Sequence, residues 1–259
     1  MSDSQIKLGS MLFSVMEPHR GYEVEYNRWY ERDHFYAGVM VGQHTFAGRR
    51  FVATRREKAL RYPADSPVSS DRTRGSYLAV YWVESEYHDA WSRWAGEQVQ
   101  WLRREDRMFP HRDHVFTVIA GHDWAAYRSA DGVPAALALD HPFQGLVVIV
   151  GAPAVGVGRE QLDAWYREEH LPQALADSPA AMCLSFSPQP MRTDSSIPQT
   201  SPDQFVHLYF LDGGPKDAWA SHFAGHGEAL AKSGLGRVQW ASPFIPTLPG
   251  TDTYADELW

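Results

Sequence analysis

The chain has 259 residues, of which 44% are apolar, enough for one large domain or for two domains of roughly 130 residues each. Its 24 basic and 32 acidic residues leave a net charge of −8, which argues against nucleic acid or an anionic membrane surface as the main partner. The single cysteine, Cys183, excludes an internal disulfide and a multi-cysteine metal cluster.

Strand-like and helix-like segments alternate along the first half of the chain. Short apolar or β-branched runs predict strands at 11–16, 45–54, 77–83 and 115–120, and helical spacing of apolar residues predicts helices at 23–37 and 87–107. The segment 49–75 is rich in Arg, Pro, Ser and Asp, which predicts an extended hairpin or a surface loop.

The second half repeats this order. We expect strands at 146–150, 181–186, 205–211 and 238–245, with helices at 159–176 and 215–233. A segment with Gly132, Pro134 and Pro142 separates the halves. The predicted division is therefore a first repeat over 1–124, a linker over 125–144 and a second repeat over 145–259.

Two sequence matches support the repeat. The segment 27–34 aligns with 163–170, an offset of 136 residues, and the pairs Tyr81-Trp82 and Tyr209-Phe210 align at an offset of 128 residues. Each half then reads βαββαβ, which forms a four-stranded antiparallel sheet with both helices on one face. Because the other face is apolar, we predict an α+β fold in which two ferredoxin-like repeats pack sheet to sheet as a pseudo-dimeric α+β barrel.

The helix motif carries a resemblance to a known group of proteins. The pattern Asn-x-Trp-Tyr-x-x-x-His at 27–34, with its counterpart Trp-Tyr-x-x-x-His-Leu-Pro at 165–172, resembles the dimeric α+β barrel superfamily, particularly its EthD-like branch, as a tandem duplication. The resemblance implies cofactor-free cyclases, small monooxygenases, isomerases or lyases, with haem bound in more distant relatives. It also implies pockets between sheet and helices. The first half departs from the pattern, with Phe35-Tyr36 where Leu-Pro is expected.

The motif supplies the first candidate site. Tyr30 and His34 lie four residues apart on one helix face, and Tyr166 and His170 repeat the arrangement. An imidazole can take a proton from carbon or oxygen, and a phenol can donate a hydrogen bond to a developing enolate. The alternative is a structural role, in which the histidine caps the helix C-terminus.

Three further groups of histidines are candidates. His111 and His114 flank Asp113 between a helix and a strand, either as a base with its orienting carboxylate or as a charged turn. His207 interrupts an apolar strand, which makes it a pocket wall or a hydrogen-bonded core residue.

The third group is His222 and His226, which have the i, i+4 spacing of metal or haem ligands. A further ligand would come from His170 or His207. The simpler interpretation is that these histidines are solvated or packed.

The expected function follows from these candidates. With 10 Trp, 12 Tyr, 12 Phe and 12 His, the chain suits a small hydrophobic or aromatic partner. We expect a cofactor-independent lyase, isomerase or cyclase acting on an aromatic or polyketide-like substrate. The alternatives are a haem-binding or cofactor-free monooxygenase-type oxidoreductase and a non-catalytic small-molecule binding protein. The chain shows no signal-peptide pattern and no run of roughly 18 apolar residues, so we expect a cytoplasmic protein. The sequence leaves open whether the protein associates further into homo-oligomers.

Overall fold

Eight strands form a closed antiparallel barrel in the computed structural model, which describes residues 6–190, 197, 198 and 200–259. The strands are β1 (Leu8–Pro18), β2 (Thr45–Val52), β3 (Tyr77–Glu84), β4 (Arg112–Tyr127), β5 (Gly145–Pro153), β6 (Ala180–Pro188), β7 (Phe205–Leu211) and β8 (Gly236–Pro246). The helices of the first half are α1 (Glu23–Trp29), the π-helix η1 (Tyr30–Met40), α2 (Arg55–Lys58) and α3 (His88–Arg104). Those that follow are η2 (Ala135–Leu137), α4 (Arg159–Ala164), the π-helix η3 (Trp165–His170), α5 (Leu171–Ala176), α6 (Pro215–Ala218), the π-helix η4 (Trp219–Phe223) and α7 (His226–Ser233).

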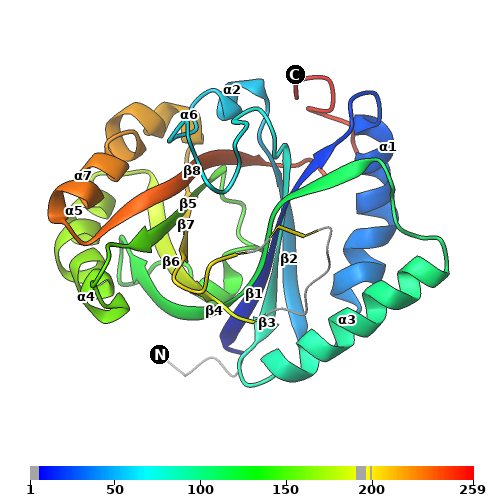
Figure 1. Cartoon of the computed structure of the whole chain (residues 1–259), viewed down its shortest axis with the longest axis horizontal. Helices are drawn as coiled ribbons and strands as arrows, with labels where there is room; N and C mark the ends of the chain where they lie inside the picture. The colour runs from blue at the N-terminus through cyan, green and yellow to red at the C-terminus, as the bar shows by residue number, and fades with distance from the viewer. Residues whose placement is uncertain (1–5, 191–196, 199) are drawn as a thin grey trace.

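The barrel consists of two equivalent four-stranded sheets. The strand order β1-β3-β2-β8-β5-β7-β6-β4 contains β4-β1-β3-β2 from the first half and β8-β5-β7-β6 from the second. The halves join where β2 pairs with β8 and where β4 pairs with β6. Helices from each half pack outside their own sheet, α1 and α3 on one side and α4 to α7 on the other (Figure 1). The predicted α+β fold, two ferredoxin-like repeats in a pseudo-dimeric barrel, is confirmed.

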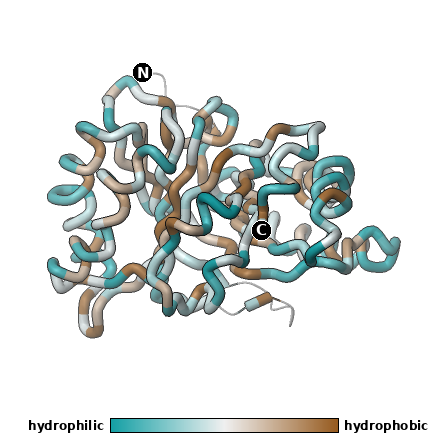
Figure 2. Tube along the Cα trace, turned by 90° about the horizontal axis from the view of Figure 1, so that it is seen from above, coloured by the Kyte–Doolittle hydropathy of each residue, from teal (hydrophilic) through white to brown (hydrophobic). Residues whose placement is uncertain are grey.

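The strands are apolar throughout because both of their faces are buried. Along β5, Val148 faces the barrel interior with Phe13 and Trp82, whereas Val147 and Ile149 pack against the helices of the second half. Figure 2 shows the hydrophobic stretches concentrated in the central strands, between more hydrophilic helices and loops. No helix among the described residues is long and apolar enough to cross a bilayer.

Several observed strand and helix boundaries differ from the predicted ones by a few residues, and the difference is largest for β4. It runs on to Tyr127, well past the predicted end at residue 120, because its last residues pair with β6. Residues 125–127 of the predicted linker therefore lie in a strand. The division into domains itself stays a prediction.

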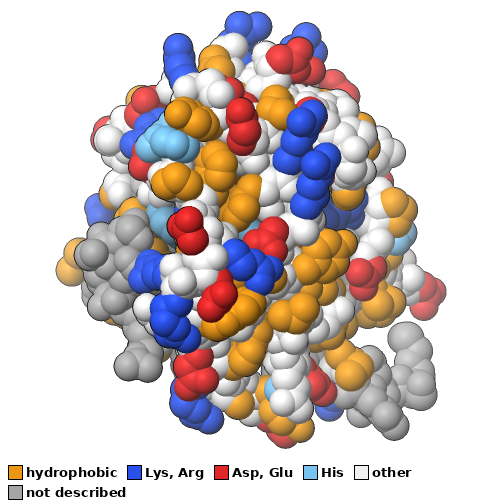
Figure 3. Space-filling model, turned by 90° about the vertical axis from the view of Figure 1, so that its right-hand side faces the viewer, with side chains coloured by type: hydrophobic (Ala, Val, Ile, Leu, Met, Phe, Trp, Pro, Cys, Tyr) orange, Lys and Arg blue, Asp and Glu red, His pale blue; other side chains and the backbone are white. Residues whose placement is uncertain are grey.

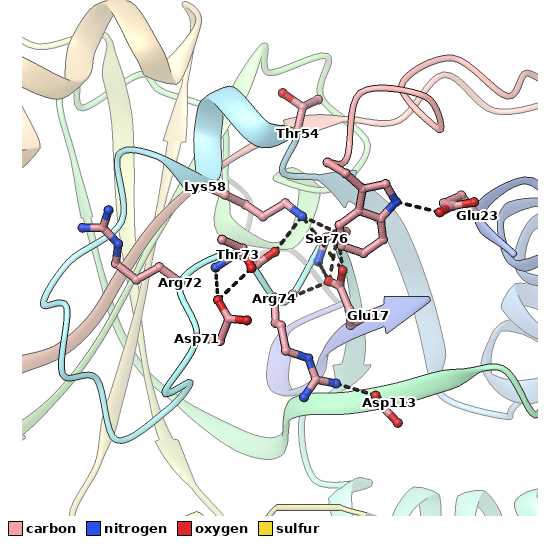
Figure 4. A network of polar contacts seen from close by, with 12 residues as sticks. Glu17, Glu23, Thr54, Lys58, Asp71, Arg72, Thr73, Arg74, Ser76 and Asp113 are labelled. Atoms are coloured by element: carbon pink, nitrogen blue, oxygen red, sulfur yellow. Dashed lines mark hydrogen bonds and ion pairs between the residues drawn. The ribbon is translucent and has the colours of Figure 1, made fainter. Parts of the chain in front are cut away.

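The segment 49–75 is only in part the surface loop that its composition suggested: residues 64, 65 and 70–73 are exposed, but several of its charged side chains are buried. Arg61 is 1% exposed and donates hydrogen bonds to Ser242 on β8 and to the carbonyl oxygen of Gly75. Lys58 is equally enclosed and donates to Thr73 and to Ser76, which also bonds the Glu17 carboxylate (Figure 4). Charged residues predict exposure only when no buried partner exists, and here the partners come from distant parts of the chain.

The C-terminal residues return to the first half. Asn27 donates to the carbonyl oxygen of Thr251 at 2.9 Å, and the Trp259 indole donates to Glu23 at 2.6 Å. Arg28 forms an ion pair with Asp252 at 2.5 Å. Through these contacts the end of the chain that follows β8 holds the outer face of α1.

Candidate active site

A cavity of about 1150 Å³ lies between the sheet and the helices of the first half. Strands β1 and β4 form its floor, and η1 and α3 form its walls. Among the lining residues are Ser14, Tyr30, His34, Trp91, Ala95, Arg112, His114 and Thr117. Figure 3 faces the helical side of this half, where apolar side chains are interleaved with basic and acidic ones.

His34 lies in the middle of η1 and faces this cavity. Its ring stacks on Trp29 with centroids 4.5 Å apart and meets the edge of Tyr30 at 5.2 Å. A Cβ at Gly38 would lie 2.9 Å from the ring, so only a glycine at this position leaves room for the imidazole. Because η1 continues to Met40, His34 does not cap a helix C-terminus, and that structural interpretation was wrong for this residue.

The π-helix explains contacts that the sequence motif did not reveal. In a π-helix, residue i bonds i+5, so the tryptophan five residues before each histidine comes to lie beside it. Trp165 stacks on His170 with centroids 4.9 Å apart, as Trp29 stacks on His34. The Trp-x4-His spacing recurs in both halves, and this repetition was the signal that an α-helical i+4 interpretation missed.

The surroundings of His34 keep its imidazole in the neutral form. Burial, aided by the nearby Arg112 guanidinium, lowers the pKa of His34 to about 3. Its Nδ1 is buried and has no hydrogen-bond partner among the described residues. An unpaired buried nitrogen is costly in a folded protein. His34 as a whole is partly exposed and lines the cavity.

Tyr30 is arranged as a hydrogen-bond donor. The Tyr81 hydroxyl donates to the Tyr30 hydroxyl at 3.1 Å, which leaves the Tyr30 proton available at the cavity. Burial raises the pKa of Tyr30, and the Arg50 guanidinium lies 4.6 Å above its ring. The phenol therefore stays protonated at neutral pH.

The floor of the cavity is polar where the rest of the sheet is apolar. Ser14 and Thr117 face each other on β1 and β4 with their hydroxyl oxygens 2.9 Å apart, and His114 Nδ1 lies 2.9 Å from Thr117 Oγ1. The strand pairing places Ile149 and Ala241 at the same positions of the second half. At these two positions the first half thus has hydroxyl groups where the second has apolar side chains.

The space that corresponds to the cavity is filled by side chains in the second half. The 128-residue offset that matches Trp91 with Trp219 also matches Ala95 with Phe223. Phe223 is 2% exposed and packs 5.4 Å from the Tyr209 ring. A small residue on α3 therefore opens the cavity in the first half, and an aromatic ring closes it in the second.

The second motif forms a packed hydrogen-bonded chain. His226 Nε2 lies 3.0 Å from the Tyr166 hydroxyl, and His226 Nδ1 lies 3.3 Å from His170 Nε2. Beneath them His207 is fully buried, with its ring 4.5 Å from that of Tyr166 and no partner for either nitrogen among the described residues. Burial lowers the pKa of His207 well below its ordinary value. His207 is therefore a core residue, but one whose hydrogen bonds are unmet.

The two histidines that flank Asp113 in the sequence lie in different surroundings in the structure. His114 lines the cavity, whereas His111 stacks on Tyr22 with ring centroids 3.7 Å apart. The Asp113 carboxylate contacts His19 at 3.2 Å and Arg74, so the ring that it orients is that of His19. Of this group, the structure brings only His114 to the cavity with His34.

His226 does not fit the role of a haem or metal ligand. Both ring nitrogens of His226 are occupied by Tyr166 and His170, and aromatic rings fill the space beside them. The part of the chain that the structure describes contains no group of three or more His, Cys, Asp or Glu residues able to hold a metal ion. We therefore derive no step through haem or a metal at His222 and His226.

No protein-family model and no curated protein sequence matches this chain. Solved structures share its fold. An anthrone oxidase-like protein superposes with a TM-score of 0.52 at 8% identity, covering 95% of both chains. A dye-decolorizing peroxidase from Bacteroides thetaiotaomicron gives 0.53 at 10% identity, covering 99% of this chain and 98% of that one. A provisionally named chlorite dismutase gives 0.54 at 15% identity, covering 98% and 100%. At these identities the similarity establishes the dimeric α+β barrel fold alone.

Proposed function

We propose that this protein is a monooxygenase-type oxidoreductase without a resident cofactor, which oxidises an aromatic or polyketide-like molecule in the cavity of the first half. The observation that carries the proposal is the neutral His34 imidazole, with its ring 5.2 Å from that of Tyr30 and near Arg112, in a cavity of about 1150 Å³. This volume slightly exceeds the roughly 300–1,000 Å³ typical of small-molecule sites, so a substrate of several fused rings fits.

The chemistry begins with a proton. An activated CH₂ group between aromatic rings gives its proton to His34, and the electron pair moves through the conjugated ring to the carbonyl oxygen on its far side, as an enolate. Tyr30 donates a hydrogen bond to this oxygen, and the positive potential of Arg112 stabilises the charge. The electron-rich enolate then reacts with dioxygen, with the balance R₂CH₂ + O₂ → R₂C=O + H₂O.

The low pKa of His34 is compatible with this role. In the free site the positive field of Arg112, which disfavours imidazolium, favours a bound anion, whereas burial penalises an isolated charge of either sign. When the enolate forms, the two opposite charges stabilise each other inside a site of low polarity. Proton transfer is therefore coupled to anion formation and does not require a basic histidine in the empty cavity.

The same proton abstraction would begin a lyase, isomerase or cyclase reaction, which was the first expectation. The names of the proteins that share the fold, an anthrone oxidase-like protein and a peroxidase among them, favour oxidation over those reactions. A tandem duplication of an EthD-like unit is part of the proposal, supported by the two Trp-Tyr-x-x-x-His motifs and by the matched strand order of the halves.

The test is oxygen consumption with anthrone and related tricyclic ketones as probes. We expect uptake of one O₂ per ketone formed, with ¹⁸O from ¹⁸O₂ in the product, and a loss of about 10²-fold in kcat for His34→Gln. The matched control is His170→Gln, which alters the equivalent motif residue of the filled half and should leave kcat unchanged. Turnover of these probes under anaerobic conditions would instead indicate an isomerase or lyase, and unchanged kcat in His34→Gln would refute the site.

A further inference from the structure

The hydrogen-bonded chain Tyr166–His226–His170 has no function in the proposed oxidation. It lies in the second half, where Tyr166 is fully buried, His226 is 4% exposed and His170 is partly exposed. The phenol oxygen and His226 Nε2 are 3.0 Å apart, within the range for proton transfer, and the two imidazoles are 3.3 Å apart. The chain thus runs from a buried phenol toward solvent.

The direction of these hydrogen bonds follows from burial. If His226 Nε2 carried the proton, the Tyr166 hydroxyl proton would have no acceptor among the described residues, at a cost of about 1–3 kcal/mol. The phenol therefore donates to His226 Nε2. His226 then carries its proton on Nδ1 and donates it to His170 Nε2.

We propose that Tyr166 is a redox-active tyrosine, a site that gives up one electron while its phenolic proton passes to His226. The electron goes to a one-electron oxidant of high potential, such as an organic peroxyl radical. The O–H bond breaks, its proton binds His226 Nε2, and the Nδ1 proton of His226 moves to His170 Nε2. The products are a neutral tyrosyl radical, a neutral His226, a protonated His170 and the reduced oxidant.

Proton transfer is what makes this phenol oxidisable. An oxidised phenol that keeps its proton is a very strong acid, so a base already within hydrogen-bond distance lowers the potential needed for oxidation. The relay also removes the positive charge from the buried ring to the more exposed His170, which limits the cost of burying it. The charged groups that face Tyr166 from α4 are Arg159 and Asp163, of opposite sign.

Two other tyrosines, the buried Tyr30 and the partly buried Tyr62, have no histidine as acceptor among the described residues. Tyr30, the counterpart in the first half, receives a hydrogen bond from the Tyr81 hydroxyl. Tyr62 donates to the carbonyl oxygen of Phe223 at 2.7 Å, and a carbonyl oxygen is a very weak base. The inference rests on the contacts of the second half and does not require the proposed oxidation to be correct.

The experiment is photo-oxidation of the full chain with tris(bipyridine)ruthenium and persulfate, read by electron paramagnetic resonance. We expect a long-lived neutral tyrosyl signal that is lost in Tyr166→Phe and in His226→Phe but kept in the matched control Tyr30→Phe. In the wild type, formation of this signal should slow in D₂O, because a proton moves with the electron. Circular dichroism establishes that each variant is folded.

Two results would overturn the proposal. A long-lived tyrosyl signal of full size in Tyr166→Phe would place the radical on another residue. A signal in His226→Phe with the wild-type yield and formation rate would show that His226 does not accept the proton. If His226→Phe does not fold, the D₂O measurement on the wild type decides, since equal rates in H₂O and D₂O contradict the relay.

Discussion

His34 and His226 should make the fold lose stability in mild acid. Burial lowers the pKa of each to about 3, whereas an unfolded histidine titrates near about 6.5. Between these values the unfolded chain binds more protons than the folded chain, so the free energy of unfolding decreases as the pH falls below about 6.5. Each histidine then costs about 2 kcal/mol at about pH 5 and almost nothing at about pH 7.5.

The measurement is urea unfolding of the wild type and of His34→Gln at about pH 7.5 and about pH 5. We expect the loss of unfolding free energy between the two pH values to be smaller in His34→Gln by about 2 kcal/mol. The control is His222→Gln, a partly exposed histidine, which should lose as much as the wild type. If His34→Gln also loses as much as the wild type, the His34 ring is not held neutral by the fold, and its role as the base loses its physical support.

Four further outcomes are expected. Ala95→Phe supplies the ring that Phe223 supplies in the second half, so a neutral fluorescent naphthylamine should bind at least about tenfold more weakly by fluorescence titration. Conversely, Phe223→Ala should lower the free energy of unfolding by about 3–5 kcal/mol in urea. Gly38→Ala would place a Cβ 2.9 Å from the His34 ring and should lower kcat with tricyclic ketones while the melting temperature changes little. Added haemin should give no bound Soret band; a band that disappears in His226→Gln would show that His226 binds the iron in place of its hydrogen bonds to Tyr166 and His170.

Local patterns predicted the elements of this fold well. The run at β7 was predicted at its observed bounds, Phe205–Leu211, because polar residues flank it directly, Gln204 before it and Asp212 after it. Repetition of the Trp-Tyr-x-x-x-His motif then predicted two matched halves. The same local logic failed for Arg61, whose partner Ser242 lies 181 residues away.

The candidate site was predicted in part. The sequence singled out Tyr30, His34 and His114, which do share the cavity, and also Tyr166, His170 and His207, which lie in a filled half. It missed Ser14 and Thr117, two ordinary hydroxyl residues whose hydrogen bond joins separate strands. A residue of that kind has no signal of its own in a single sequence.

The sequence alone therefore determined the order of the elements, the two matched halves and the residue types available for proton transfer, since these depend on local periodicity and on repetition. Only the tertiary structure decided which half is open. That outcome depends on Ala95 and Phe223 facing their sheets, and on Ser14 meeting Thr117 across a strand pair. The Tyr166–His226–His170 chain was equally hidden, because its members are distant in sequence and only folding brings their polar atoms within hydrogen-bond distance.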